Sequence, residues 1–283
     1  MAATSSGQRA RRAPWLVATD LDGTVVRSDG TISPRTVAAL ARVEDAGAGL
    51  VFVTGRPPRW MHPVAEATGH HGLAICANGA VVYDMHAERV VASHEIAGPV
   101  VRDVVARLRD ALPGVGFAVE RLTGLAYEES YRPRWRTAAT PVDDLDDVLT
   151  ADEPDDPVVK LLARLEDMAA DDLLASARSV AGDGVELTHA NSADCLLEIS
   201  AAGVSKATTL AGLCADRGVD AQDVLAFGDM PNDLPLLAWA GTAYAVANAH
   251  PDVLAAVTLH TAANDEDGVA EVLERYFPPP PRS

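Results

Sequence analysis

Positive charge, cysteine and long apolar runs are all scarce in this chain of 283 residues. Lys and Arg number 23 against 41 Asp and Glu, so the formal net charge is −18. Such an acidic balance argues against a nucleic-acid-binding surface. It also means that an anionic substrate would be repelled unless a bound metal ion and local basic groups reversed the field.

The three cysteines, Cys76, Cys195 and Cys214, show no CxxC spacing, which favours buried, reduced thiols in a cytoplasmic protein. No run approaches the ~20 apolar residues of a membrane span, and residues 1–12 lack the apolar segment of a secretory signal. We therefore expect no membrane partner. The basic residues 1–13 and the proline-rich residues 278–283 are predicted to be disordered tails.

What the chain has is enough hydrophobic sequence, 48% of its residues, for a large core or for two domains. Up to residue 84, apolar strands alternate with helices that begin at Ser33-Pro34 and Pro57-Pro58. The predicted strands are residues 15–18, 49–53 and 73–77. Strand–helix alternation is typical of a parallel, Rossmann-like doubly wound α/β sheet.

The pattern changes near residue 84 and returns near residue 190. Between them, amphipathic strands such as residues 90–96 mix with more charged helices and show no strand–helix–strand rhythm. We predict that residues 85–189 are an α+β domain inserted into a core formed by residues 14–84 and 190–277. Apolar strands at residues 195–199 and 224–228 would belong to the second part of that core.

Two carboxylates lie one residue apart at the end of the first strand. Asp20 and Asp22 directly follow an apolar run and are followed by Gly23. Asp is a poor strand former and is costly to bury unpaired, whereas ligands bind at the carboxyl ends of strands in open α/β sheets, where a metal ion would neutralise the charge. A hairpin turn, part of a calcium loop or a solvated loop are the alternatives.

Three further predicted strands are followed by polar groups, and in a parallel sheet all of these strand ends would share one edge. Each group has an ordinary explanation: a strand cap, an exposed lysine at a helix start, or acids at a helix N-terminus. Their joint occurrence favours a site. The groups are Thr54, Ser205-Lys206, and Asp229 with Asn232 and Asp233.

Together these residue types supply the parts of phosphoryl transfer. Asp20 is ionised at neutral pH and can attack phosphorus as a nucleophile. Asp22 can protonate the leaving group and later deprotonate water. Mg²⁺ prefers oxygen ligands, which Asp20 and Asp229 provide, while Thr54 and Lys206 can bind the phosphoryl oxygens.

The chain resembles the haloacid dehalogenase superfamily over nearly its whole length except the tails. Its four motifs are matched by Asp-Leu-Asp-Gly-Thr at residues 20–24, Val-Thr-Gly-Arg at 53–56, Lys206 at the start of a helix, and Gly-Asp-Met-Pro-Asn-Asp at 228–233. Asn78-Gly79 and residues 264–270 match as well. The long insertion between the second and third motifs resembles the type IIB (C2B) cap of Cof-like phosphatases.

The resemblance implies a role for each motif residue. Asp20 would be the nucleophile and a Mg²⁺ ligand, and Asp22 the acid/base and a ligand through its backbone carbonyl. Asp229 would ligate Mg²⁺, and Asp233 would hold the water shell of the ion. The phosphoryl group would be bound by Thr54, Gly55, Lys206 and Asn232.

Contacts to the rest of the substrate are predicted at Asn78, Arg56, Arg132 and Arg134. The last two lie in the stretch Arg-Pro-Arg-Trp-Arg, which concentrates positive charge in an acidic chain and could draw in an anionic substrate; a solvated surface loop is the alternative. His70, His71 and His189 show no metal-ligand pattern in the sequence.

We expect a Mg²⁺-dependent phosphatase that hydrolyses a small phosphorylated metabolite, a sugar phosphate or nucleotide-like ester, through an aspartyl phosphate. A phosphomutase on the same scaffold and a non-catalytic phosphometabolite-binding regulatory protein are the alternatives. The expected protein is cytoplasmic, a monomer or homodimer, and has a small phosphorylated metabolite as its partner.

Overall fold

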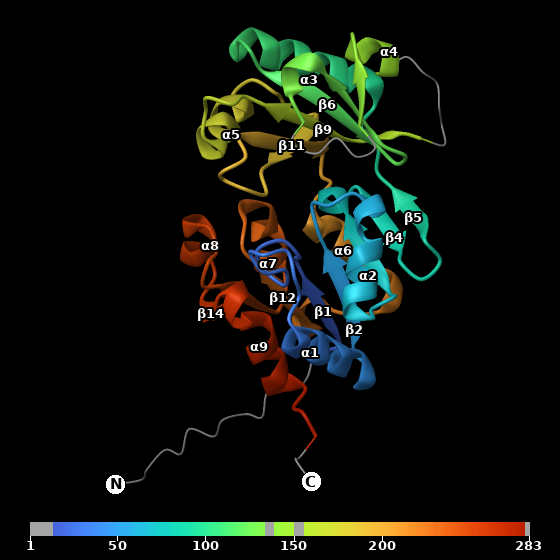
Figure 1. The fold of residues 1–283 in the computed structure, drawn as a ribbon, viewed down its shortest axis with the longest axis vertical. Coiled ribbons are helices and arrows are strands. Elements are labelled where there is room, and N and C mark those ends of the chain that lie inside the picture. Colours follow the sequence, from blue (N-terminus) through green and yellow to red (C-terminus); the bar gives the residue numbers. More distant parts are fainter. Residues whose placement is uncertain (1–13, 134–138, 150–155, 281–283) are drawn as a thin grey trace.

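Two β-sheets, each with helices of its own, form the two halves of the molecule (Figure 1). The computed structural model describes residues 14–133, 139–149 and 156–280. The predicted tail at residues 1–13, and residues 281–283 of the other, lie outside this described part. We call the eight-stranded sheet the core sheet and the six-stranded sheet the cap sheet.

The core sheet has the strand order β14-β13-β12-β1-β2-β3-β4-β5. Neighbouring strands from β14 to β3 are parallel, and β4 and β5 are added antiparallel. This confirms the predicted parallel α/β core. The strands are β1 Leu16–Thr19, β2 Gly49–Val53, β3 Leu73–Cys76, β4 Val81–Asp84, β5 Arg89–Ser93, β12 Val224–Gly228, β13 Thr242–Val246 and β14 Leu259–Thr261.

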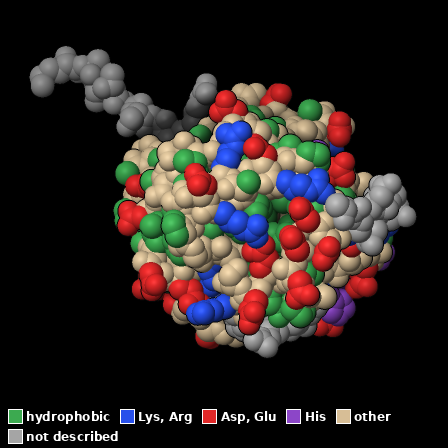
Figure 2. Space-filling view, turned by 90° about the horizontal axis from the view of Figure 1, so that it is seen from above, with side chains coloured by type: hydrophobic (Ala, Val, Ile, Leu, Met, Phe, Trp, Pro, Cys, Tyr) green, Lys and Arg blue, Asp and Glu red, His purple; other side chains and the backbone are tan. Residues whose placement is uncertain are grey.

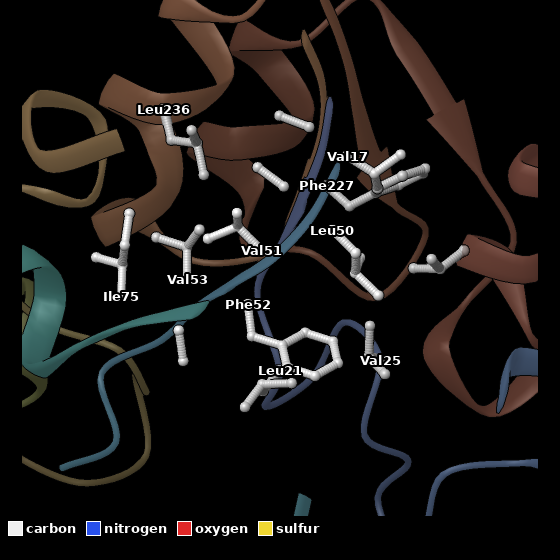
Figure 3. Close-up of a cluster of buried hydrophobic side chains, with 14 of the residues drawn as sticks. Val17, Leu21, Val25, Leu50, Val51, Phe52, Val53, Ile75, Phe227 and Leu236 are labelled. Carbon is white, nitrogen blue, oxygen red and sulfur yellow. The ribbon is translucent and has the colours of Figure 1, made fainter. Parts of the chain in front are cut away.

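The central strands of the core sheet are buried on both faces. Along β2, Leu50 and Phe52 point to one side while Val51 and Val53 point to the other (Figure 3), as the two-residue period of a strand requires. Helices cover a parallel sheet on both faces, which explains the unbroken apolar sequence of β2. These helices are α1 Pro34–Asp45, α2 His62–Thr68, α6 Lys206–Arg217, α7 Leu234–Trp239, α8 Pro251–Ala256 and α9 Gly268–Tyr276.

The cap sheet has the order β10-β11-β9-β6-β7-β8 and is antiparallel except for the β7–β8 pair. Helices α3 and α4 lie on its side away from the core sheet, with α5 beside α3 (Figure 1). This is the predicted α+β architecture. The elements are α3 Gly98–Ala111, β6 Gly116–Arg121, β7 Leu125–Glu128, β8 Ala139–Val142, α4 Leu145–Leu149, β9 Val158–Arg164, α5 Ala170–Arg178, β10 Val185–Thr188 and β11 Leu196–Ala201.

Two strands join a different sheet from the one expected. The strand predicted at residues 195–199 is β11, which pairs with β9 and β10 in the cap sheet. The strand predicted to open the insertion is β5, which pairs with β4 in the core sheet. In both cases a short connection joins the strand to an antiparallel partner, and amphipathic alternation alone does not reveal that partner. The domain boundaries at residues 84 and 190 stay predictions.

None of the helices among the described residues combines the length and the apolar character that crossing a membrane needs. The three cysteines are free thiols; Cys76 and Cys214 are buried as expected, and Cys195 is half-buried.

Candidate active site

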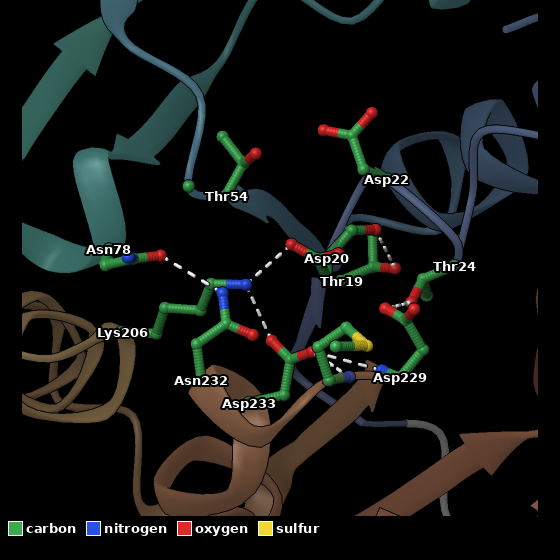
Figure 4. A network of polar contacts seen from close by, with 12 residues as sticks. Thr19, Asp20, Asp22, Thr24, Thr54, Asn78, Lys206, Asp229, Asn232 and Asp233 are labelled. Carbon is green, nitrogen blue, oxygen red and sulfur yellow. Dashed lines mark hydrogen bonds and ion pairs between the residues drawn. The ribbon is translucent and has the colours of Figure 1, made fainter. Parts of the chain in front are cut away.

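Three adjacent parallel strands bring the predicted residues to one edge of the core sheet. In the order β12-β1-β2, Asp229 follows the first strand, Asp20 the second and Thr54 the third. All three side chains are buried, and they lie close together in Figure 4. Parallel pairing aligns the carboxyl ends of strands, so the topology of the sheet itself assembles this part of the site.

Lys206 reaches the same edge by a route that the sequence did not predict. It follows β11 of the cap sheet, not a strand of the core sheet, and is the first residue of α6. The helix start is fixed by Ser205, whose Oγ accepts from the backbone N–H of Thr208 at 3.2 Å. From there the Lys206 ammonium donates to Asp20 Oδ1 at 2.6 Å and to Asp233 Oδ1 at 2.7 Å.

Three buried carboxylates surround this single ammonium. Oxygens of Asp20, Asp229 and Asp233 all lie within 4.8 Å of one another. Burial, reinforced by the neighbouring carboxylates, raises the pKa of Asp20 to about 7 and that of Asp229 to about 9. Burial disfavours the charge of the Lys206 ammonium, but the carboxylates of Asp20 and Asp233 favour it and raise the pKa of Lys206. Lys206 therefore stays protonated. Near neutral pH the metal-free cluster therefore favours protonated carboxyl groups, and a bound cation would take the place of these protons and leave Asp20 and Asp229 ionised.

The cluster fits a magnesium ion. Thr24 Oγ1 donates to Asp229 Oδ1 at 2.9 Å. Gly23 has φ +79°, and a Cβ there would lie 2.3 Å from Asp229 Oδ2, so only glycine leaves room for this carboxylate. Asp20 and Asp229 thus present oxygen ligands, as Mg²⁺ prefers.

Asp233 has a different task from the other two carboxylates. Its Oδ1 accepts from Lys206, and its Oδ2 accepts from the backbone N–H groups of Asp229 and Met230, each at 3.0 Å. A Cβ at Gly228 would lie 2.6 Å from Asp233 Cβ, so the chain passes close to it. Asp233 therefore fixes the loop that carries Asp229, which suits a supporting role behind the metal ligands.

Asp22 points away from Asp20 (Figure 4). It pairs with Arg56, whose Nε donates to Asp22 Oδ2 at 2.7 Å and whose Nη2 donates to Oδ1. The Asp22 side chain is 57% exposed. Proton transfer at the leaving group would require this carboxylate to turn away from Arg56 and toward Asp20.

Asn78 connects the core to the cap. It follows β3 with φ 58°, directly after Ala77 with φ 51°, two left-handed non-glycine residues in succession. Its Oδ1 accepts from Asn232 Nδ2 at 3.1 Å, and its Nδ2 donates to Glu198 Oε2 at 3.0 Å. Backbone strain of this kind persists where the surroundings fix it and is frequent at functional sites.

The residues that the cap sheet contributes to the site were not predicted from the sequence. Lys160 on β9 donates to Glu198 on β11 and, at 2.8 Å, to the backbone carbonyl of Gly55. Arg59 pairs with Glu120 of β6. A signal was available: Lys160 and Glu198 each have apolar residues on both sides in a strand sequence, and buried charges need partners.

Strand alternation explains why these charges face the site. On β9, Leu161 and Ala163 pack into the cap's hydrophobic core, whereas Lys160, Leu162 and Arg164 line a cavity of about 650 Å³. Asp20, Asp22, Gly55, Arg56 and Asn232 line the same cavity from the core side. It therefore lies between the free face of the cap sheet and the carboxyl edge of the core sheet.

The charge inside this cavity differs from the charge outside. Asp and Glu side chains are spread over the molecular face seen from above, with basic side chains scattered among them (Figure 2). Lys160 and Arg164, in contrast, are buried in the cavity wall, at 3% and 7% exposure, where Lys160 pairs with Glu198. The cavity lining has four basic side chains against five acidic ones, so its charge is close to balanced, whereas the whole chain carries −18.

Of the two arginines predicted to contact the substrate from the basic stretch, only Arg132 is among the described residues. Arg132 is 72% exposed and pairs with Glu166 at 3.0 Å on the cap surface, and it is not among the described residues that line the cavity. Arg134 lies outside the described residues. Charge in the sequence does not reveal which way a loop residue faces. Among the described residues, the basic side chains that line the cavity are Lys160 and Arg164 of β9 and Arg56 and Arg59 of the core.

Comparison with known proteins places these features in a family. Residues 17–273 match the family model of the haloacid dehalogenase-like hydrolases. The chain is 28% identical to a pyridoxal phosphate phosphatase, YbhA, of Escherichia coli, with 93% of this chain and 98% of the relative covered. It is 31% identical to a phosphoglycolate phosphatase of Natronomonas pharaonis, with 92% and 96% covered.

A solved structure is similar in fold. The HAD subclass IIB sugar phosphatase BT4131 superposes with a TM-score of 0.75 over 92% of this chain and 98% of its own, at 20% identity. Because the alignment spans both sheets, the similarity covers the cap as well as the core.

Proposed function

Because this chain belongs to the haloacid dehalogenase-like hydrolases and is a phosphoric monoester hydrolase, we propose that Asp20 is the nucleophile of a Mg²⁺-dependent phosphatase of the Cof-like IIB type. The observation that carries the proposal is the Lys206 ammonium, 2.6 Å from Asp20 Oδ1 inside a cluster of buried carboxylates. The substrate is a small phosphorylated metabolite, a sugar phosphate or nucleotide-like ester.

In the first half-reaction an oxygen of Asp20 attacks phosphorus and the bond to the leaving oxygen breaks, which leaves an aspartyl phosphate. Lys206 holds Oδ1 through its hydrogen bond, so the carboxylate is oriented and its charge partly balanced. Asp20, Asp229 and the backbone carbonyl of Asp22 would hold Mg²⁺. When bound, the ion masks negative charge between nucleophile and phosphate.

Thr54, Gly55, Lys206 and Asn232 would bind the phosphoryl oxygens. Asp22 protonates the leaving alkoxide, and in the second half-reaction the same carboxylate deprotonates the attacking water. Both steps require Asp22 to leave its pair with Arg56. That pairing restricts Asp22 until a substrate occupies the cavity.

The size and lining of the cavity support a small metabolite. Its volume of about 650 Å³ is within the ordinary range for small-molecule sites. Leu162, Leu196 and Tyr131 supply apolar contact area and Arg164 supplies a cation. The leaving group would lie against these cap residues, while the phosphoryl group lies at the carboxyl edge of the core sheet.

Phosphate release from a panel of esters in Mg²⁺ tests the proposal. The panel contains hexose phosphates, nucleoside monophosphates, pyridoxal phosphate and phosphoglycolate. We expect Asp20→Asn and EDTA each to reduce release by at least about 10³-fold, whereas Asp45→Asn, on the exposed side of α1, leaves it unchanged. Isomerised sugar phosphates without free phosphate would indicate a phosphomutase, and binding without turnover a regulatory protein; either result would overturn the proposal.

A further inference from the structure

A second group of metal-ligating side chains lies where the cap meets the core, outside the carboxylate cluster. Asp171 comes from α5, His189 directly follows β10, and His250 directly precedes α8 of the core. One ligand atom of each lies within 4.8 Å of the other two. We infer that Asp171, His189 and His250 form a binding site for a divalent transition-metal ion of the Zn²⁺ type, and that this ion fastens the cap to the core.

The ligand atoms are already arranged around a common point. His189 Nε2 lies 2.8 Å from Asp171 Oδ1, and His250 Nε2 lies 3.3 Å from Asp171 Oδ2. The two rings meet edge to face, with centroids 5.9 Å apart. Ligands bound tetrahedrally to Zn²⁺ at ~2.0–2.1 Å lie ~3.3 Å from one another. Small side-chain shifts would therefore let an ion replace the two hydrogen bonds.

Burial and access both suit an ion. His189 is fully buried and His250 is 10% exposed, which protects their metal bonds from water, whereas the Asp171 side chain is 53% exposed and leaves a path from solvent. The buried Nδ1 of His189 has no hydrogen-bond partner among the described residues. A buried polar atom without a partner is uncommon in folded proteins and calls for an explanation, of which a bound ion beside the ring is one.

His250 also has a partner for its second nitrogen. Its Nδ1 accepts from the backbone N–H of Asp252 at 3.2 Å, and the carboxylate of Asp252 lies 3.9 Å away. When Nε2 bonds to an ion, Nδ1 carries the proton and gives up the hydrogen bond that it accepts from the Asp252 N–H. The Asp252 side chain, 74% exposed, can then turn to accept that proton, the usual arrangement behind a metal-bound histidine.

The donor set separates this site from the carboxylate cluster. Two imidazoles and one carboxylate suit Zn²⁺, Co²⁺ or Ni²⁺, whereas Mg²⁺ prefers sites made of oxygen. The two sites are nevertheless connected, because the backbone N–H of His250 donates to the carbonyl oxygen of Asp229 at 2.7 Å. An ion bound to Asp171, His189 and His250 would therefore tie the cap to the loop that carries Asp229.

Zn²⁺ and Co²⁺ titrations of the full chain in a large excess of Mg²⁺ test the inference. Equilibrium dialysis gives the stoichiometry, the visible absorption of bound Co²⁺ reports the geometry, and the melting temperature reports the link between the domains. Asp171→Asn keeps the hydrogen-bonding shape, and His250→Asn keeps a good helix-capping residue at the start of α8. His189 is left intact because it is fully buried.

Two matched variants serve as controls: Asp172→Asn, the exposed neighbour on α5, and His260→Asn, an exposed histidine whose ring contacts only backbone carbonyls. We expect one equivalent of Zn²⁺ and a raised melting temperature in the wild type and in both controls. Asp171→Asn and His250→Asn should weaken binding by at least about tenfold and abolish the rise in melting temperature.

Two results would overturn the inference: Zn²⁺ binding that both site variants retain, or binding that increasing Mg²⁺ removes completely, which would place the ion in the carboxylate cluster. Because binding is measured directly, the outcome does not depend on whether the chain hydrolyses phosphate esters.

Discussion

The two walls of the cavity carry buried charges that are held in different ways. On the core wall, Asp20 follows its strand directly and Lys206 begins a helix, so backbone topology fixes both. On the cap wall, Lys160 and Glu198 lie in the middle of antiparallel strands and reach across to Gly55 and Asn78. The core wall can therefore be preorganised for chemistry without the cap, whereas the charges of the cap wall find their partners only when the two parts are together.

Replacing the buried lysine of the core wall should have the largest effect. Lys206→Met leaves Asp20 and Asp233 without their shared cation. We expect kcat to fall by about 10²–10³-fold and the metal-free protein to lose about 3–5 kcal/mol of stability, the usual cost of breaking a buried ion pair. Steady-state kinetics and denaturant unfolding measure the two effects. Arg217→Met, at the exposed end of α6, should change neither; wild-type kcat in Lys206→Met would contradict the assignment.

The matching change on the cap wall should have a smaller effect of a different kind. Lys160→Met removes the contacts to Gly55 and Glu198 but leaves the nucleophile and its cation in place. We expect kcat/KM to fall by about tenfold, because the cap is then less well fixed over the site. Glu198 is also left buried with an unpaired charge, which adds to the cost.

A double-mutant cycle separates these two contributions. Glu198→Gln removes the carboxylate charge that Lys160→Met leaves unpaired. The double variant Lys160→Met/Glu198→Gln should therefore be more stable than Lys160→Met alone. Strict additivity of the stability changes would mean that the two residues act independently, contrary to the contact between them.

The pH dependence of stability should also come from the core wall. Burial and neighbouring carboxylates raise the pKa of Asp20 to about 7 and of Asp229 to about 9, from the ordinary 3.8. Asp233 adds to both shifts, Asp22 adds to that of Asp20, and Lys206 opposes both. Between pH 3.8 and these values the folded state binds more protons than the unfolded state. The stability that these two groups contribute to the metal-free protein therefore falls as pH rises through this range.

Magnesium should oppose this loss of stability at high pH, because the ion binds the ionised form of the carboxylates and releases protons from the protonated form. We expect the rise in melting temperature caused by Mg²⁺ to be larger at about pH 9 than at about pH 6, and to be mostly lost in Asp229→Asn. Differential scanning calorimetry with and without EDTA measures it. An equal Mg²⁺ effect at both pH values would mean that the ion does not bind at these carboxylates.

The same difference between the walls explains what the sequence could predict. Asp20, Thr54 and Asp229 each follow a strand, so a parallel sheet alone is enough to bring them together. The pairing of β11 with β9, and hence the meeting of Glu198 with Lys160, depends on long-range antiparallel register that no local pattern specifies.

The group formed by Asp171, His189 and His250 is even harder to predict from the sequence. His189 and His250 are 61 residues apart in the numbering, and Asp171 lies on a third element. No spacing rule joins residues from a helix, a strand end and a helix start in two different domains, so His189 alone showed no ligand pattern. Only the packing of cap on core brings the three together.

The smallest effect on KM should come from Arg132, in the basic stretch that was predicted from the sequence to contact the substrate. Arg132 forms an exposed ion pair with Glu166, and such pairs contribute about 0–1 kcal/mol. We expect Arg132→Ala to change KM by less than about twofold at physiological salt. Arg164, in contrast, is buried in the cavity wall, with its guanidinium 5.3 Å from the ring centroid of Tyr131. Arg164→Ala should raise KM by about tenfold or more, since it removes a desolvated cation from the substrate's surroundings. Should Arg132→Ala raise KM more than Arg164→Ala does, the cations that select the substrate lie in the loop and not on β9.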